Sequence, residues 1–69
     1  MNDHIYQMLE LTGSSTESSD QAVRAAVAQA AEKIKHMEWF EVIETRGELK
    51  KGEVVVWQVT LKIGYRLES

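Results

Sequence analysis

An aromatic ring and a side-chain amide are the groups in this chain best suited to chemistry. Trp39 opens the segment Trp-Phe-Glu-Val-Ile-Glu-Thr-Arg, and Gln58 lies in the alternating apolar segment that follows. An indole supplies a flat stacking face, and a carboxamide supplies two donors and an acceptor. On neighbouring strands, the two side chains suit a planar heterocycle. From the pattern alone, the simpler interpretation is favoured: Trp39 as a core or interface aromatic, and Gln58 as an exposed strand residue.

Other reactive groups are sparse, so we expect no catalytic residues and no enzyme. The chain has no cysteine, and its serines cluster in residues 13–19 and at the end of the sequence, away from any Ser-His-Asp arrangement. Glu32 and His36 are four residues apart and could share a metal ion. Two ligands make a weak site, however, and an exposed helical pair is the favoured interpretation. We therefore expect no metal.

The elements that must position these groups follow from hydrophobic periodicity. Apolar residues fall on one face over 4–12 and 53–67, which is typical of strands, and residues 39–48 are expected to form a further strand between them. A helix is expected to begin after Ser18, which forms a capping box with Gln21, and to run for about 18 residues. Its apolar stripe recurs at spacings of four and three residues: Val23, Val27, Ala30, Ile34 and Met37. Three basic residues are expected in its last turn, where cations are favoured: Lys33, Lys35 and His36.

Turn-forming residues separate these elements. Residues 13–19, Gly-Ser-Ser-Thr-Glu-Ser-Ser, are expected to form a loop. The segment Leu-Lys-Lys-Gly-Glu contains the turn between the last two strands, with Gly52 at positive φ. Gly47 and Gly64 fall inside strand patterns, which indicates bulges or close backbone approach.

The last strand is too long for the helix to cover. Its apolar residues point to one face: Val55, Trp57, Val59, Leu61, Ile63, Tyr65 and Leu67. The strand spans roughly 50 Å at about 3.3 Å per residue, whereas the helix spans about 27 Å. Part of the stripe must meet another molecule, and a symmetric homo-oligomer is the usual answer. On the same alternation, Trp57 is expected to point away from Gln58 and into the core.

Length and charge limit the remaining possibilities. With 69 residues, the chain is expected to form a single domain over 1–69, and one of this size commonly needs a ligand or a partner for stability. A net charge of −3 argues against a nucleic-acid partner. No apolar run approaches the roughly 20 residues of a membrane span, and the first residues do not resemble a secretion signal. A cytoplasmic protein without membrane partners is expected.

The sequence resembles the dodecin family over nearly its whole length. The resemblance is carried by Ile5-Tyr6, by Glu10-Leu11-Thr12-Gly13-Ser14-Ser15, by the alanine-rich helix, by Trp39-Phe40-Glu41-Val42 with Glu44-Thr45-Arg46-Gly47, and by residues 58–67. It implies an α+β, β-α-β-β fold in which a three-stranded antiparallel sheet wraps one amphipathic helix. It further implies a hollow homo-dodecamer that holds flavins in pairs between symmetry-related tryptophans.

What the resemblance implies about the site can be placed on residues of this chain. Trp39 would stack on the isoalloxazine, and Gln58 would bond its pyrimidine edge. Arg46 and Arg66 would either neutralise the phosphate of FMN or form salt bridges between subunits. Riboflavin or FMN is the expected ligand, and FAD or lumichrome shares the same ring. A closely stacked tryptophan would quench the excited flavin, which implies storage and photoprotection.

Some dodecins also bind coenzyme A near the first strand and the helix. The residues of this chain that could contact it are His4, Tyr6, Lys33 and Lys35. Gln29 and Ala31 are neutral where some coenzyme-A-binding relatives are basic, which argues against tight binding. Two alternatives to flavin storage stay open: a structural or interaction homo-oligomer without flavin, and a flavin-dependent reductase that uses a nicotinamide cofactor.

Overall fold

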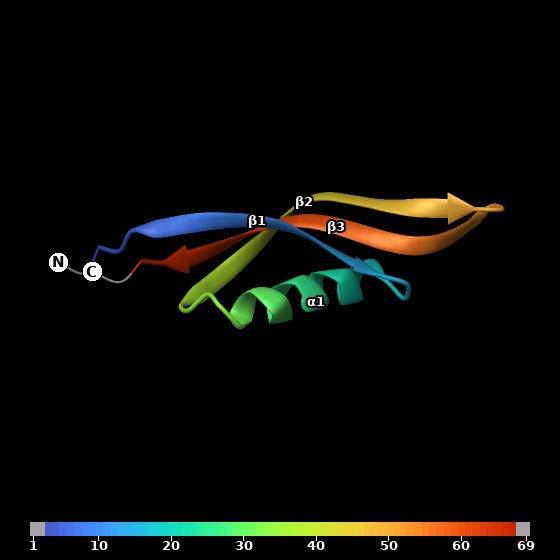
Figure 1. Ribbon diagram of the computed structural model, residues 1–69. Helices are drawn as coiled ribbons and strands as arrows, with labels where there is room; N and C mark the ends of the chain where they lie inside the picture. Colours follow the sequence, from blue (N-terminus) through green and yellow to red (C-terminus); the bar gives the residue numbers. More distant parts are fainter. Residues whose placement is uncertain (1–2, 68–69) are drawn as a thin grey trace.

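The computed structural model describes residues 3–67 and contains three strands and one helix. In chain order these are β1 (Tyr6–Ser15), α1 (Ser19–Ala31), β2 (Met37–Lys50) and β3 (Glu53–Arg66). The sheet order is β1-β3-β2, with both neighbours antiparallel to β3. The helix packs on one face of the sheet, mainly on β1 and β3 (Figure 1). This is the predicted β-α-β-β fold.

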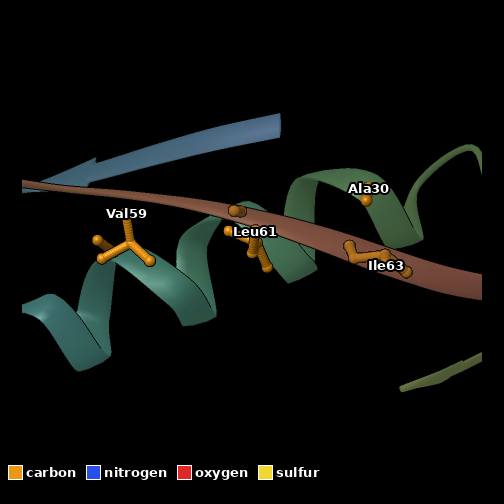
Figure 2. Packing of buried hydrophobic residues seen from close by; sticks show 6 residues of the cluster. Ala30, Val59, Leu61 and Ile63 are labelled. Carbon is orange, nitrogen blue, oxygen red and sulfur yellow. The ribbon is translucent and has the colours of Figure 1, made fainter. Parts of the chain in front are cut away.

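The core lies between the middle of β3 and the helix. Val59, Leu61 and Ile63 are buried and project toward α1 (Figure 2). The buried residues of the helix are its smallest: Ala22, Ala26 and Ala30. Of the predicted stripe, Ala30 is buried in this core, whereas Val23 and Val27 pack only partly against it. Small side chains at every fourth position let the helix approach the sheet closely, and this leaves the valines at the side of the contact.

The first strand continues further than the sequence predicted. Residues 13–19 were expected to form a loop, but β1 extends through Ser15, where it pairs with Trp57. Gly13 is buried under the helix, and a Cβ at this position would overlap the carbonyl oxygen of Ala22. It would also approach the Ala26 Cβ to 2.9 Å. Gly13 thus marks the closest approach of helix and sheet, not a loop.

The helix is shorter than its apolar stripe indicated. It ends at Ala31, and the backbone N–H groups of Lys33 and Ile34 both donate to the Ala30 carbonyl. The last turn contains no basic residue, so the prediction of cations there was wrong. Met37 belongs to β2 and pairs with Tyr65. The spacing of Met37 also suited a helix, but its pairing with a distant strand places it in β2.

The connection between β2 and β3 is a two-residue hairpin. Lys51 and Gly52 have φ angles of 53° and 79°. Two consecutive residues at positive φ are typical of a type I′ turn, whose twist matches that of the flanking strands. The prediction for Gly52 is confirmed, and Lys51 adopts the same unusual region. The tight turn lets β2 and β3 pair through Lys50 and Glu53.

The predicted N-cap is also present. Ser18 has extended backbone angles, and its Oγ accepts a hydrogen bond from the Gln21 backbone N–H at 3.1 Å. The Ser18 N–H donates to Ser15 Oγ at 3.4 Å, so Ser15 provides the partner that a capping box would take from Gln21.

Replacing Ser18 by alanine should therefore destabilise the fold modestly. We expect the free energy of unfolding to fall by about 1 kcal/mol, because one helix N–H loses its acceptor. Denaturant unfolding at fixed protomer concentration measures the change, with Ser14→Ala as the control for loss of an exposed hydroxyl. Equal stability of the two variants would contradict the capping role.

The protomer is elongated and leaves much apolar surface uncovered. It measures 56 × 20 × 13 Å, with a radius of gyration of 14.5 Å. A compact chain of this length has a radius of gyration of about 11 Å. Its accessible surface is 5304 Å², against about 4,400 Å² for a compact monomer of this mass. Exposed apolar surface of this kind marks interaction sites.

Part of this exposed apolar surface lies on the β2–β3 hairpin, which extends past the helix (Figure 1). Because β1 ends opposite Trp57, the hairpin beyond that residue has only two strands. Leu49 and Val54 lie there with exposed fractions of 72% and 44%. Trp57 itself is only partly buried and stands outside the core cluster. Alternation placed it on the correct face, but the prediction that it packs in the core was wrong, because the helix does not reach it.

Candidate functional site

Trp39 is near the start of β2, and its side chain lies across the middle strand, β3. It pairs with Gly64 of β3, after a register shift between Met37 and Trp39. The six-membered ring of the indole covers Gly64, because a Cβ there would overlap Cε2 and Cζ2. The residue nevertheless keeps an exposed fraction of 42%. Trp39 is therefore seated on the backbone and still offers aromatic surface to a ligand, and Gly64 shows the close approach predicted for it.

Tyr6 of β1 borders the same ring. The Tyr6 and Trp39 ring centroids are 5.1 Å apart at an interplanar angle of 63°, an edge-to-face arrangement. Such pairs contribute about 0.5–1.5 kcal/mol beyond burial of area. His4 stands edge-on to Tyr6 in turn, with centroids 6.4 Å apart. The strand pairing therefore collects aromatic rings at this end of the sheet.

Arg66 belongs to this end as well. Its guanidinium lies 3.9 Å from Glu38 Oε2 and 3.5 Å from His36 Nδ1. The backbone joins the same segments, since the Arg66 N–H donates to the His36 carbonyl at 3.0 Å. His36 has a φ of 65° and follows the end of the helix by several residues, so its predicted place in the last turn was wrong. An exposed pair of this kind contributes about 0–1 kcal/mol, and the Arg66 guanidinium remains accessible to an anion.

Gln58 and Arg46 form a second group. They are register partners on β3 and β2, and Arg46 Nε donates to Gln58 Oε1 at 2.9 Å. This bond orients the carboxamide so that its NH₂ group is turned away from Arg46. Gln58 therefore presents two donors and one remaining acceptor lone pair for a ligand edge. Arg46 was predicted either to neutralise a phosphate or to form salt bridges between subunits, and its Nη groups still carry donors for either role.

The two groups do not meet within one protomer. Trp39 is opposite Gly64, whereas Gln58 is six residues away along β3. At about 3.3 Å per residue, this separation is roughly 20 Å. β2 and β3 are neighbours, as expected, but their register keeps the indole and the amide apart. A single planar ring therefore cannot contact both side chains of one protomer.

The remaining candidate residues are dispersed. Lys33 and Lys35 lie in the segment between α1 and β2, while His4 and Tyr6 are at the start of the chain near Trp39. Glu32 is the C-cap of α1, so Glu32 and His36 do not form the expected helical pair. Among residues 3–67, no group of three or more His, Cys, Asp or Glu side chains could hold a metal ion. In that part of the chain, no helix has both the length and the apolarity that a membrane crossing requires.

Sequence reasoning missed two neighbours of the indole. Tyr6 was considered only for coenzyme A, and Glu38 was not considered at all. What places Tyr6 near the indole is the antiparallel register, which pairs Tyr6 with Arg66, two residues from Gly64 on β3. That register is not visible in a local pattern.

Together, the fold and this surface define a small β-α-β-β binding protein with an exposed aromatic platform. A sequence model of the family described as Dodecin matches residues 5–68. The curated Dodecin of Thermus thermophilus is 42% identical over 65 residues, covering 94% of each chain. The chain belongs to the dodecin family.

Solved structures agree with this assignment. The dodecin from Streptomyces coelicolor has a TM-score of 0.93 at 45% identity, covering 100% of this chain and 99% of that one. The dodecin from Streptomyces davaonensis has a TM-score of 0.92 at 40% identity, covering 99% of this chain and 100% of that one.

Proposed function

We propose that this protein binds riboflavin or FMN without turning it over, as a cytoplasmic store that protects the flavin from light. The observation that carries the proposal is the seating of Trp39, whose indole rests on Gly64 and keeps an exposed fraction of 42%. A flat, partly exposed indole suits the isoalloxazine ring, which stacks on it through its π-face.

The separation of Trp39 from Gln58 supports a site shared by protomers. One protomer would supply the stacking face, and another would supply the Gln58 edge with its Arg46 partner. The uncovered apolar surface gives protomers a physical reason to associate. We infer a hollow homo-dodecamer with flavins in pairs between tryptophans, the assembly that membership of this family suggests.

The test is a titration of ligand-free protein with riboflavin and FMN. Flavin fluorescence is followed on particles whose size has been checked by size-exclusion chromatography. Saturating, strong quenching near one flavin per chain would support the proposal, because an adjacent indole quenches excited flavin by electron transfer. Full fluorescence with an intact large particle would refute it in favour of the alternative, a structural homo-oligomer without flavin.

Replacement of Arg46 can distinguish two roles of this residue, orienting Gln58 and neutralising a phosphate. If its main task is to orient Gln58, Arg46→Met should weaken riboflavin and FMN equally, by about fivefold, because an uncharged partner leaves the amide free to rotate. If it neutralises a phosphate, only FMN should lose affinity. We expect the first result, since Arg46 Nε already bonds Gln58 Oε1. In a Gln58→Ala background, Arg46→Met should then have little further effect on riboflavin, and additive losses would contradict the orienting role.

A further inference from the structure

Gly64 has an unusual position for a glycine. It is buried in the middle strand, paired with Met8 on one side and Trp39 on the other. A glycine inside a central strand weakens the strand, and it commonly marks a place where another group approaches the backbone closely. Here the approaching group is identified, because a Cβ on Gly64 would overlap the Cε2, Cζ2 and Cη2 atoms of Trp39.

The overlap means that the indole is lowered onto the peptide backbone. Any larger residue at position 64 would have to raise or tilt the ring. The height of the indole above the sheet is therefore set by backbone atoms, which are rigid in a hydrogen-bonded strand, and not by a mobile side chain. The exposed ring surface stands at a defined level for whatever stacks on it.

Tyr6 restrains the ring laterally. It extends from β1, on the far side of β3 from Trp39, and meets the indole edge-to-face with centroids 5.1 Å apart. Edge-to-face contacts are directional, because the positive edge of one ring meets the negative face of the other. Three strands therefore contribute to one aromatic position: β2 supplies the indole, β3 the seat and β1 the restraint.

We propose that Gly64 and Tyr6 are positioning residues, which hold the Trp39 indole ready as a rigid platform before any ligand binds. Preorganisation raises affinity by removing the cost of ordering the ring during binding. The inference rests on the proposed flavin function for its ligand, and it restricts that ligand to planar ring systems that can stack on an indole held at a fixed height above the sheet. The seating of the indole can also be tested without ligand.

The main test compares Gly64→Ala with the control Gly47→Ala. Gly47 is also a strand glycine, but its nearest heavy atoms would be Val56 O at 3.0 Å and a Val54 methyl at 3.5 Å, with no indole among them. We expect riboflavin affinity to fall at least about tenfold for Gly64→Ala and to change little for Gly47→Ala. The fluorescence lifetime of bound flavin should lengthen in Gly64→Ala, because electron transfer from a displaced indole is slower. In a Trp39→Ala background, Gly64→Ala should cause no further loss.

Tyr6→Leu provides a second test that does not strain the sheet, since Tyr6 has an exposed fraction of 40%. It should weaken riboflavin binding by about threefold and lengthen the bound lifetime, but less than Gly64→Ala. This variant decides the question if Gly64→Ala fails to assemble. Unchanged affinity and lifetime in both variants would overturn the proposal, as would a Gly64→Ala loss that persists without Trp39.

A ligand-free measurement separates this inference from the flavin function itself. In a Trp57→Phe background, Trp39 is the remaining tryptophan, and its fluorescence emission reports how exposed and how mobile the indole is on Gly64. Gly64→Ala should shift that emission to longer wavelength and lower its anisotropy, because the displaced ring is more exposed and more mobile. If the parent does not bind flavin but these shifts appear, the flavin function fails and the positioning role stands. If the parent binds flavin and the emission is unchanged, the positioning role fails alone.

Discussion

Replacing Trp39 by alanine should abolish most flavin binding and leave the assembly intact. The change removes the stacking face at the centre of the site, and truncation of a central aromatic anchor commonly costs about 3 kcal/mol, or roughly a hundredfold in affinity. The protomer should still fold, because Trp39 is not part of the core cluster. Assembly should survive, because the uncovered apolar surface of the strands carries it. The measurements are riboflavin quenching and size-exclusion chromatography.

Two further variants make the result specific. Trp39→Phe keeps a smaller ring and should give an intermediate affinity. Trp57→Phe alters the other tryptophan, which lies on the hairpin away from Gly64, and should bind flavin like the parent. If Trp39→Ala bound riboflavin as tightly as the parent, the assignment of the stacking face would be wrong. If Trp39→Ala lost the large particle, the indole would be an interface residue instead.

Replacing Gly13 by alanine should have the largest effect on folding. The added methyl group would meet the Ala22 carbonyl oxygen and the Ala26 Cβ, and backbone atoms cannot turn aside as a flexible side chain can. Overpacking commonly costs about 1–3 kcal/mol, and we expect the upper end here. A core this small supplies only about 3–5 kcal/mol, so most of the protomer's stability would be lost.

Thermal unfolding followed by circular dichroism tests this expectation. Protomer concentration must be held constant, because oligomer stability depends on it. Ser14→Ala is the matched control, since Ser14 is the exposed neighbour of Gly13 on the same strand. A melting temperature for Gly13→Ala equal to that of the control would show that the helix can move away from the sheet at little cost.

The candidate site around Trp39 and Gln58 could be proposed from the sequence in its residue types but not in its arrangement. A tryptophan at the start of a strand and a glutamine within the next strand are visible in the sequence, and both occupy the predicted elements. Their placement in one site assumed a register that puts them opposite each other. The actual register pairs Trp39 with Gly64 and Gln58 with Arg46. A shift of register leaves every local pattern unchanged while moving a side chain by many ångströms along its neighbour.

The sequence by itself determined the order of the elements, the Ser18 cap, the turn at Gly52 and the alternation that buries Val59, Leu61 and Ile63. These depend on residues a few positions apart, where periodicity and φ preferences act directly.

Tertiary structure decided the helix face, the end of the helix before Met37, the burial of Gly13 and the seating of Trp39 on Gly64. Each of these depends on which distant residues come opposite one another. The packing of the sheet against the helix decides the helix face and the burial of Gly13, because only there does Gly13 meet Ala22 and Ala26. The register of β2 on β3 decides the seat of Trp39, because it brings the indole onto Gly64.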